Sequence, residues 1–356
     1  MADRGMRGTM PAATERDDES YLAFVQSLRS HTLRAHRDAA IEAGKSAVAA
    51  WERATGRKAD RAVYRDALDQ SASVQVRNRL MRSHQEMMWN GIIDTYRKRH
   101  DELVAALDRA SLSGPGSVEV DPGFVYPAYY DDVAFHIQPG SYHREPLAGY
   151  IYHYGLEIFT QGASANDDLH RKMVQLIPAP RDGEVRRVLD LGCTIGQTTT
   201  ALKERFPTAE VIGIDAAAPM VRYSHHRAAA LGLDVHFKQR LAEATGFPGG
   251  AFDLVFAFIL FHEIPREIAS EVIAEAHRVL RPGGLFVVVD FPNRDPNGTP
   301  DWADYARDFD ADFNGEPYSV DFVYRDFGAQ LRQVFAEVVE DWQPSPGQPM
   351  RVCIKG

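Results

Sequence analysis

Apolar residues recur at helical spacing through the first third of the chain. One proline-free stretch, residues 19–110, is rich in Ala, Arg, Leu and Glu. Polar residues around Gly56 indicate a break, and Asp60 is suited to be the N-cap of a short helix. The pattern predicts two long helices and one short helix in a helical N-terminal domain over residues 19–116. The repeating apolar positions are Ile41, Val48, Trp51, Leu80, Met81, Met87, Met88, Ile92, Tyr96, Leu103, Val104 and Leu107.

The pattern changes to closely spaced Tyr and His residues over residues 117–180. Several glycines and prolines interleave with these residues. Two interpretations stay open: a packed connector that buries its rings and leaves their polar tips wet, or a lid over a functional site. Its ring residues include Tyr126, Tyr129, Tyr130, His136, Tyr142, His143, Tyr150, Tyr152, His153 and Tyr154.

From residue 181 to 356, short apolar runs alternate with helical stretches. This alternation predicts an α/β domain with a mostly parallel sheet and helices on both faces. The last two runs are joined by a Pro/Gly-rich loop, which is typical of an antiparallel edge. The expected strands are 187–191, 210–215, 235–238, 252–257, 284–290, 335–342 and 350–355.

Composition narrows the class of protein. The chain has 356 residues and a net charge of −10, and this acidic balance argues against a nucleic-acid-binding protein. Its two cysteines are too few for a disulfide scaffold. No apolar run is long enough to span a membrane. Residues 1–18 are charged and lack a signal-peptide core, so we expect a disordered tail and a cytoplasmic protein.

The most informative segment is Val188–Gln197, where a strand ends, glycines permit a tight turn, and a helix begins. Such a turn lets a ligand approach backbone amides at the carboxyl edge of the sheet. Asp215 ends the next strand, where an acidic side chain accepts hydrogen bonds from ribose hydroxyls. A G-x-G-x-x-G nicotinamide fingerprint and a P-loop are both absent.

This run resembles the first motif, D-x-G-x-G-x-G, of class I S-adenosylmethionine-dependent methyltransferases. Four further segments resemble later motifs of the family: Asp215, Phe252–Val255, Phe261–Pro265 and Leu280–Leu285. The nearest resemblance is to the small-molecule, ubiquinone-methylase-like group. It implies a Rossmann-like seven-stranded sheet, with S-adenosyl-L-methionine as cofactor and S-adenosyl-L-homocysteine as product. The cofactor-binding residues that it implies are Asp190, Gly192, Cys193, Thr194, Gly196, Asp215, Ala216, Met220, Leu241, Ala242, Glu243 and Phe258.

Two positions depart from the family pattern. Thr194 replaces the middle glycine of the first motif, and Thr tolerates positive φ poorly. Leu241 stands where the family often has an Asp that reads the adenine amino group, which leaves the Ala242 amide and Glu243 as partners.

Methyl transfer from a sulfonium needs alignment, exclusion of water and, for a protonated acceptor, a base. His262 follows the fourth strand of the domain and is the first candidate for that base, with a structural role as the alternative. Glu263 is a weaker candidate. Tyr152 and His153 are candidates from the segment that precedes the domain, where a ring can cover the sulfonium.

An insertion at 292–328 combines aromatic residues with acidic ones, and seven of the acids lie within residues 301–321. In the family this position often builds substrate-binding walls. Three interpretations of the acids stay open: they select a cationic or polyhydroxylated substrate, they hold a metal, or they form a solvated helix face. No metal site is assigned. The seven acidic residues within 301–321 are Asp301, Asp304, Asp308, Asp310, Asp312, Glu316 and Asp321.

The sequence therefore predicts methyl transfer to an O, N or C atom of a small molecule, of a secondary-metabolite or lipid-like kind. The alternatives are a methyltransferase-like fold that does not methylate, such as a cofactor-assisted cyclase or a structural partner, and a macromolecule methyltransferase. No nucleic-acid partner is expected. The amphipathic N-terminal helices predict a homodimer.

Overall fold

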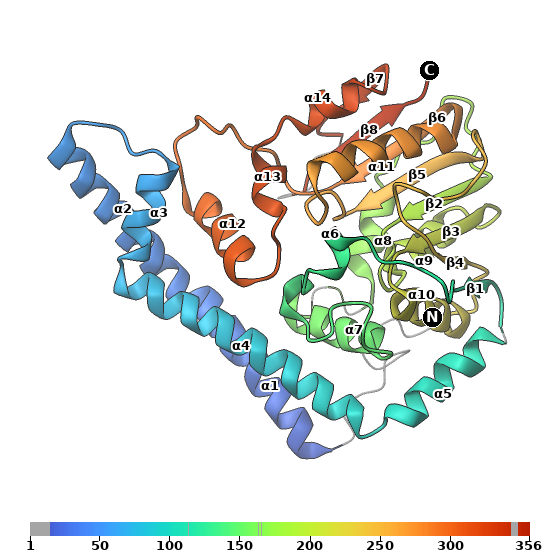
Figure 1. Cartoon of the computed structure of the whole chain (residues 1–356), viewed down its shortest axis with the longest axis horizontal. Coiled ribbons are helices and arrows are strands. Elements are labelled where there is room, and N and C mark those ends of the chain that lie inside the picture. Colours follow the sequence, from blue (N-terminus) through green and yellow to red (C-terminus); the bar gives the residue numbers. More distant parts are fainter. Residues whose placement is uncertain (1–14, 113, 163, 165, 343–347) are drawn as a thin grey trace.

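The computed structural model describes residues 15–112, 114–162, 164, 166–342 and 348–356. It consists of an α/β domain built on one sheet and a long helical arm (Figure 1). Most of the expected N-terminal tail, residues 1–14, lies outside the described residues, and the first helix already begins at Arg16. Within the described part of the chain, no helix is both long and apolar enough to cross a membrane.

The sheet has the strand order β1-β4-β3-β2-β5-β6-β8-β7. Only β8 is antiparallel, and it lies between β6 and β7. The predicted α/β class with a mostly parallel sheet is confirmed. The strands are β1 (Ser117–Glu119), β2 (Arg187–Leu191), β3 (Glu210–Asp215), β4 (His236–Gln239), β5 (Phe252–Phe258), β6 (Leu280–Val289), β7 (Glu337–Val339) and β8 (Met350–Ile354).

The described sheet has eight strands instead of the seven expected. The additional strand, β1, comes from the start of the Tyr/His-rich segment and pairs parallel to β4, with Ser117 opposite His236. A Cβ atom on Gly116 would lie 2.1 Å from the carbonyl oxygen of Val235, so only glycine permits this approach. The segment expected to be a connector therefore also extends the sheet.

Alternate residues of the strands pack against helices on opposite faces. Leu189 and Leu191 of β2 belong to a core with α11 (Arg266–Val279), α13 (Ser319–Tyr324) and α14 (Phe327–Arg332). Val188 belongs to a second core, which includes residues of α8 (Asp168–Val174), α9 (Gln197–Arg205) and α10 (Ala218–Ala230). Burial on both faces explains why these strands read as continuous apolar runs.

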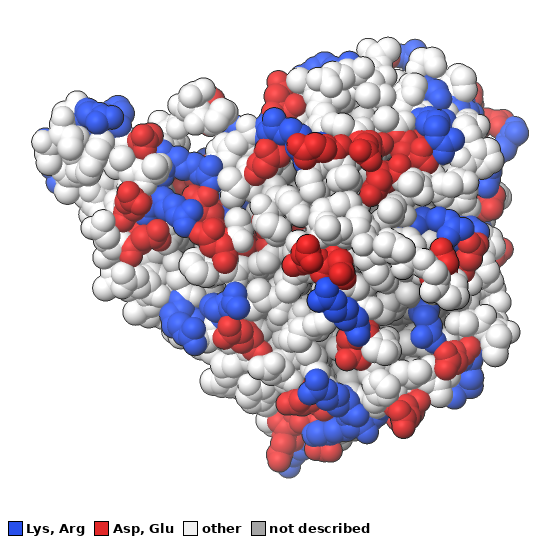
Figure 2. Space-filling model, viewed as in Figure 1, with Lys and Arg blue, Asp and Glu red and all other residues white. Residues whose placement is uncertain are grey.

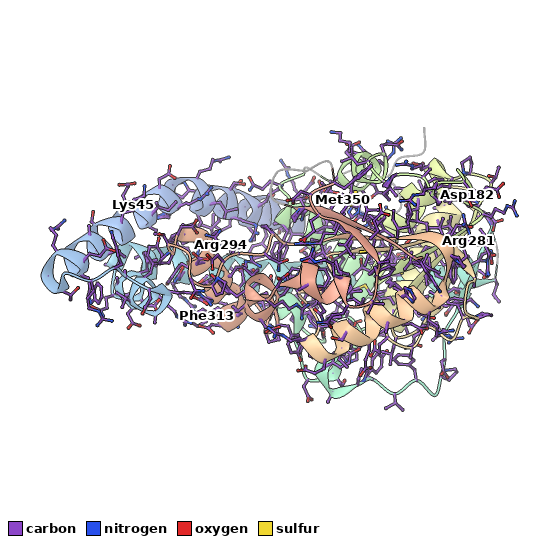
Figure 3. The ribbon with its side chains drawn as sticks, turned by 90° about the horizontal axis from the view of Figure 1, so that it is seen from above. Lys45, Asp182, Arg281, Arg294, Phe313 and Met350 are labelled. Carbon is purple, nitrogen blue, oxygen red and sulfur yellow. The ribbon has the colours of Figure 1, made fainter. Side chains whose placement is uncertain are left out.

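The arm is more continuous than the apolar pattern predicts. Helix α1 (Arg16–His31) runs through a π-helical segment, η1 (Thr32–His36), directly into α2 (Arg37–Thr55). The short α3 (Arg61–Asp69), α4 (Ala72–Arg97) and α5 (His100–Ser111) follow. The predicted N-cap is confirmed, since the Asp60 side chain accepts a hydrogen bond from the Val63 N–H. Seen from above, Lys45 of α2 lies at one end of the molecule and Asp182 and Arg281 at the other (Figure 3).

The arm shares a hydrophobic core with the α/β domain. Trp89 of α4 packs on α7 (Ala148–Phe159), where a Cβ on Gly155 would lie 2.3 Å from the indole ring. The same core includes Tyr150 of α7 and Tyr223 of α10. Helix α7 of the Tyr/His-rich segment therefore packs between the arm and the α/β domain. The segment also forms two short helical turns, α6 (Ala128–Asp131) and η2 (Phe135–Ile137).

Ion pairs with arginines of the arm bind the acidic insertion to it. Asp308 and Asp312 of α12 (Trp302–Phe313) form ion pairs with Arg61 and Arg65 of α3. Figure 2 shows acidic and basic side chains interleaved where α3 meets α12. Among the described residues, no group of three or more His, Cys, Asp or Glu is arranged to hold a metal ion. Several of the insertion's acids thus join it to the arm.

Candidate functional site

The turn that follows β2 uses three residues in the left-handed region. Gly192 has φ +67° and Gly196 has φ +72°, and the non-glycine Thr194 has φ +44°. The Cys193 N–H donates to the carbonyl of Ile214 at 2.9 Å, which joins the turn to β3. A Cβ on Gly196 would lie 2.9 Å from the ring of Phe237. The glycines thus allow the backbone to turn where side chains do not fit.

Asp215 closes this turn from the end of β3. Its Oδ2 accepts a hydrogen bond from the Thr194 N–H at 3.0 Å, and its Oδ1 accepts one from the Ala217 N–H at 2.8 Å. Burial raises the pKa of Asp215 to about 6, although these two N–H groups oppose the rise. Each oxygen keeps a further lone pair for a ligand hydroxyl.

Asp190, at the end of β2, holds an unsatisfied oxygen. Its Oδ2 accepts a hydrogen bond from the Thr199 hydroxyl at 2.6 Å, whereas its buried Oδ1 has no hydrogen-bond partner. Burial raises the pKa of this carboxyl to about 7, against the effect of Thr199. A buried oxygen of this kind requires a donor, such as a ligand ammonium group.

A cavity of about 590 Å³ opens beside the turn. Its size is that of a small-molecule site. Eleven of the residues singled out from the sequence line it: Tyr152, Asp190, Gly192, Cys193, Thr194, Asp215, Ala216, Leu241, Ala242, Glu243 and Phe258.

Four other singled-out residues do not line this cavity. Gly196 begins α9 behind the turn, and Met220 is fully buried in the core shared with the arm. His153 shares a hydrogen bond of 2.7 Å with the Tyr223 hydroxyl, and burial lowers its pKa to about 3. His262 lies behind the cavity wall, with an exposed side-chain fraction of 1%.

The end of the cavity next to Asp215 is closed by the Tyr/His-rich segment. The Tyr129 hydroxyl donates a hydrogen bond to Glu243 Oε1. The Tyr126 hydroxyl accepts one from Gln239 Nε2 at 3.2 Å, and Gln239 also donates to the carbonyl of Ala216. Residues of this segment therefore lie at the Asp215 end of the site.

The opposite end of the cavity is an aromatic chamber built by several distant segments. Trp89 comes from the arm, and Phe291 follows β6. The density of Tyr and His indicated part of this chamber, but no local signal marks Trp89. Its other apolar and aromatic residues are Tyr130, Phe135, His136, Tyr142, Leu156 and Phe159.

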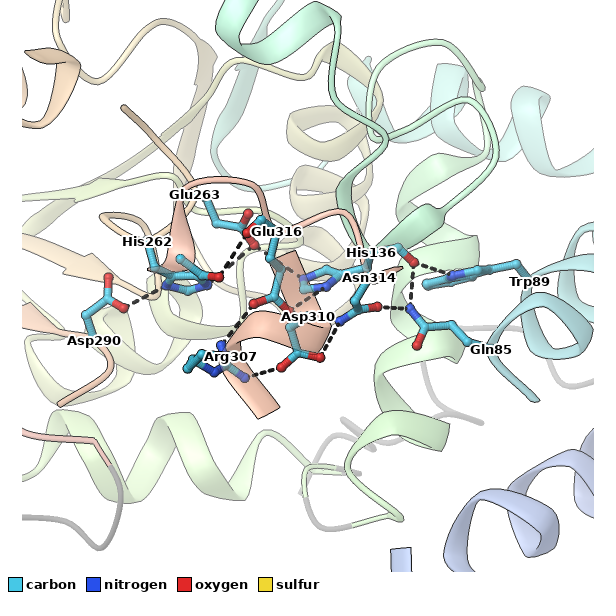
Figure 4. A network of polar contacts seen from close by, with 11 residues as sticks. Gln85, Trp89, His136, His262, Glu263, Asp290, Arg307, Asp310, Asn314 and Glu316 are labelled. Atoms are coloured by element: carbon cyan, nitrogen blue, oxygen red, sulfur yellow. Dashed lines mark hydrogen bonds and ion pairs between the residues drawn. The ribbon is translucent and has the colours of Figure 1, made fainter. Parts of the chain in front are cut away.

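A row of alternating charges runs from the chamber wall into the insertion (Figure 4). His262 Nδ1 lies 2.7 Å from Asp290 Oδ1, and its Nε2 lies 3.5 Å from Glu263 Oε1. His136 Nε2 lies 3.4 Å from the same Glu263 oxygen, and His136 Nδ1 lies 3.3 Å from Glu316. The row continues through Arg307, which pairs with Glu316 at 3.0 Å and also with Asp310.

Neighbouring carboxylates raise the pKa of both histidines of this row. Burial lowers the pKa of His262, but Asp290 and Glu263 outweigh burial and raise it to about 10. Burial also lowers the pKa of His136, but Glu316 and Glu263 outweigh burial and raise it. An imidazolium has no free lone pair, so His262 in this state cannot accept a proton.

The backbone at His136 is strained and is held by hydrogen bonds from the arm. His136 and Ile137 have φ +50° and +53°, in the left-handed region that non-glycine residues avoid. The carbonyl of His136 accepts hydrogen bonds from Trp89 Nε1 at 2.8 Å and from Gln85 Nε2 at 2.7 Å. Strained residues over-determined by their surroundings are typical of functional sites.

Comparison with known proteins identifies the family of the α/β domain. Residues 188–284 match the family model described as a methyltransferase domain. Demethylmenaquinone methyltransferase from Thermus thermophilus is 43% identical over 110 residues, which are 30% of this chain and 48% of that protein. The fatty-acid O-methyltransferase of Mycolicibacterium smegmatis is 33% identical over 142 residues, 39% of this chain and 50% of that protein.

Among solved structures, an O-methyltransferase family protein from Burkholderia thailandensis is similar with 19% identity and a TM-score of 0.47. The match covers 57% of this chain and 60% of that one. The chain spans about half the length of the curated relatives it matches.

The sheet and the turn define a ligand-binding α/β enzyme domain with its site at the carboxyl ends of the strands. Together with the comparisons, they show that the chain carries a class I S-adenosylmethionine-dependent methyltransferase domain. The predictions of the family, of a methyltransferase and of S-adenosylmethionine as its cofactor are confirmed for this domain. The residues fit that cofactor, since Asp215 has lone pairs for ribose hydroxyls and the buried Asp190 Oδ1 lacks the hydrogen-bond donor that an ammonium group would supply.

Proposed function

We propose that this chain methylates an O, N or C atom of a small, largely apolar molecule of a secondary-metabolite or lipid-like kind. One observation carries the proposal: a single cavity reaches from Asp215 to an aromatic chamber built outside the matched domain. When bound, S-adenosylmethionine supplies an electrophilic methyl group. The residues of the chain orient the acceptor and exclude water.

In this proposal each part of the cavity has its own task. Asp215 accepts hydrogen bonds from the ribose hydroxyls, and Asp190 Oδ1 accepts one from the amino-acid part of the cofactor. Tyr129 and Glu243 enclose the adenine end. Tyr152 contributes an aromatic face near the sulfonium, where a positive charge is stabilised by the ring. His262, which is charged and buried, holds Glu263 in place from behind the wall.

Calorimetric titration with S-adenosylhomocysteine tests the cofactor site. The wild-type chain is expected to bind, and Asp215→Asn to bind at least tenfold more weakly, because a charge-assisted hydrogen bond is lost. Asp94→Asn, an exposed change on α4, is the matched control and keeps wild-type affinity. Equal affinity of all three proteins would refute the assignment of Asp215.

Transfer of labelled methyl from S-adenosylmethionine to a cell extract tests the activity. We expect label in the low-mass, organic-soluble fraction. Label confined to protein or nucleic acid would support a macromolecule methyltransferase instead. Binding of the cofactor with no transfer to any fraction would support a non-methylating role.

We further propose a homodimer in contact through α1. Tyr21 and Phe24 on this helix have exposed fractions of 40% and 55%, while Leu22 and Val25 pack inward. A second copy of the chain would cover these exposed rings. We propose the cytoplasm as the compartment because both cysteines, Cys193 and Cys353, are free thiols.

A further inference from the structure

Glu263 uses only one of its two carboxylate oxygens within the protein. Oε1 faces the imidazoles of His262 and His136, at 3.5 Å and 3.4 Å. Oε2 is buried and has no hydrogen-bond partner among the described residues. A buried carboxylate oxygen without a hydrogen-bond donor carries the full desolvation cost of the group. The site is therefore complete only when a donor reaches Oε2.

The donor must come from the cavity, because Glu263 lines it. The neighbours of Glu263 on the cavity side are aromatic: Tyr130, Tyr142 and Tyr152 all line the same cavity. The buried Tyr130 hydroxyl also lacks a partner. A flat, apolar body suits these walls, with one polar group at Glu263.

The surroundings of Glu263 decide which donor fits. Two histidines already flank Oε1, and burying an ammonium group among the aromatic walls of the cavity costs more desolvation than burying a neutral hydroxyl. A neutral hydroxyl gives Oε2 a hydrogen bond without adding charge, and a bond to an ionised acceptor is stronger than a neutral one. The surroundings of Glu263 thus favour a hydroxyl over an ammonium group.

We propose that Glu263 Oε2 accepts a hydrogen bond from a neutral hydroxyl on an apolar, ring-bearing substrate, and so selects the acceptor oxygen. This inference rests on the proposed function and narrows it to O-methylation of a hydroxylated ring compound. His262 contacts Glu263 but does not line the cavity, whereas His136 both contacts Glu263 and lines the aromatic chamber. The strained backbone at His136 and its two hydrogen bonds fix this arrangement from the arm side.

Calorimetric titration with two matched probes tests the proposal. The chain, saturated with S-adenosylhomocysteine, is titrated with 2-naphthol and with 2-methoxynaphthalene, in which a methyl group replaces the hydroxyl proton. We expect wild type to prefer the naphthol at least tenfold, as the loss of one charge-assisted hydrogen bond implies. Glu263→Gln is expected to reduce this preference to about threefold or less. Glu267→Gln, an exposed change on α11, is the control and keeps the wild-type preference.

Three results would overturn the proposal: equal affinity of wild type for both probes, binding of neither, or a preference that survives in Glu263→Gln. Tighter binding of 1-naphthylmethylammonium than of naphthol would also overturn it, in favour of an amine substrate. Should Glu263→Gln not fold, Glu263→Asp withdraws the carboxylate by one methylene and is expected to show the same loss. Failure of S-adenosylhomocysteine to bind would instead refute the proposed function, so the two failures are distinguishable.

Discussion

Asp215 illustrates how much of this site depends on single side chains. It holds the turn through the Thr194 N–H, holds the start of α10 through the Ala217 N–H, and faces the cavity. The motif predicted its position because a strand end and a glycine turn are local features. The sequence cannot show that burial raises its pKa to about 6, since that burial is contributed by distant segments.

We predict that the affinity for S-adenosylhomocysteine falls as the pH drops below about 6. The ionised form of Asp215 accepts the ribose hydrogen bonds, so protonation competes with binding by up to tenfold per pH unit. Titrations at several values between pH 5 and 8 measure this. Asp215→Asn should show a flatter dependence, and parallel curves for the two proteins would contradict the assignment.

His262 leads to a prediction about stability. Its pKa in the folded chain is about 10, above the ordinary value of 6.5, so the folded state binds the proton more tightly. The resulting stabilisation is fully present below about pH 6.5 and is lost as the pH rises through about 10. In that window it falls by up to about 1.4 kcal/mol per pH unit.

Urea unfolding of wild type and His262→Gln between pH 6 and 9.5 measures this contribution. The difference in free energy of unfolding between the two proteins is expected to shrink as the pH rises. A difference that stays constant over this range would show that His262 is neutral in the folded chain.

Thr194 occupies a left-handed position with φ +44°, where the family places glycine. We predict that Thr194→Gly raises the free energy of unfolding by up to about 1 kcal/mol, because relief of strain exceeds the entropic cost of glycine. Binding of S-adenosylhomocysteine should persist, since the Thr194 N–H remains. A loss of stability, measured by urea unfolding, would show that the threonine side chain contributes more than its backbone costs.

At the level of elements, the sequence predicted the sheet far better than the arm. Strand bounds such as Glu210–Asp215 agree because buried parallel strands are short apolar runs with clear ends. The π-helical segment η1 and the edge strand β1 were missed. The first depends on helix packing within the arm, and the second on pairing with β4, and neither leaves a periodic signal.

The contact between α4 and α7 also depends on packing, and it can be tested. Gly155→Ala places a methyl 2.3 Å from the Trp89 ring, which is buried and cannot move aside. We expect the free energy of unfolding to fall by about 1–3 kcal/mol, although alanine favours the helix by about 1 kcal/mol relative to glycine. Gly123→Ala, whose added atom meets only Asp121 at 3.4 Å, is the control. Equal stability of the two variants in urea would contradict the tight contact.

For the whole molecule, the proposed dimer predicts a measurable mass. Light scattering of the full chain is expected to give twice the mass of 39.8 kDa. Phe24→Glu, which places a charge on the exposed face of α1, should give the monomer. A monomeric wild type, or a dimer that the substitution leaves intact, would contradict the contact through α1.

The candidate site is likewise a property of the whole chain. The cofactor half was predictable because its residues lie in one continuous domain. His136 and Glu263 are in contact in the fold, but strands β2 to β5 lie between them in the sequence. The sequence flagged both regions, but the choice between His262 and Glu263 depended on which side chain faces the cavity. That orientation is set by Asp290, which binds His262 and the Phe261 N–H from the end of β6.

The ion pairs between α3 and α12 join residues 247 positions apart, and this separation has a consequence for synthesis. At about 5–20 residues per second, the ribosome makes Asp308 roughly 12–50 s after Arg61. During that interval the face of α3 that meets α12 lacks its partner, although the strands up to β6 have already been made. That face of α3 therefore stays uncovered until late in synthesis, and it is the part on which a chaperone would be expected to act.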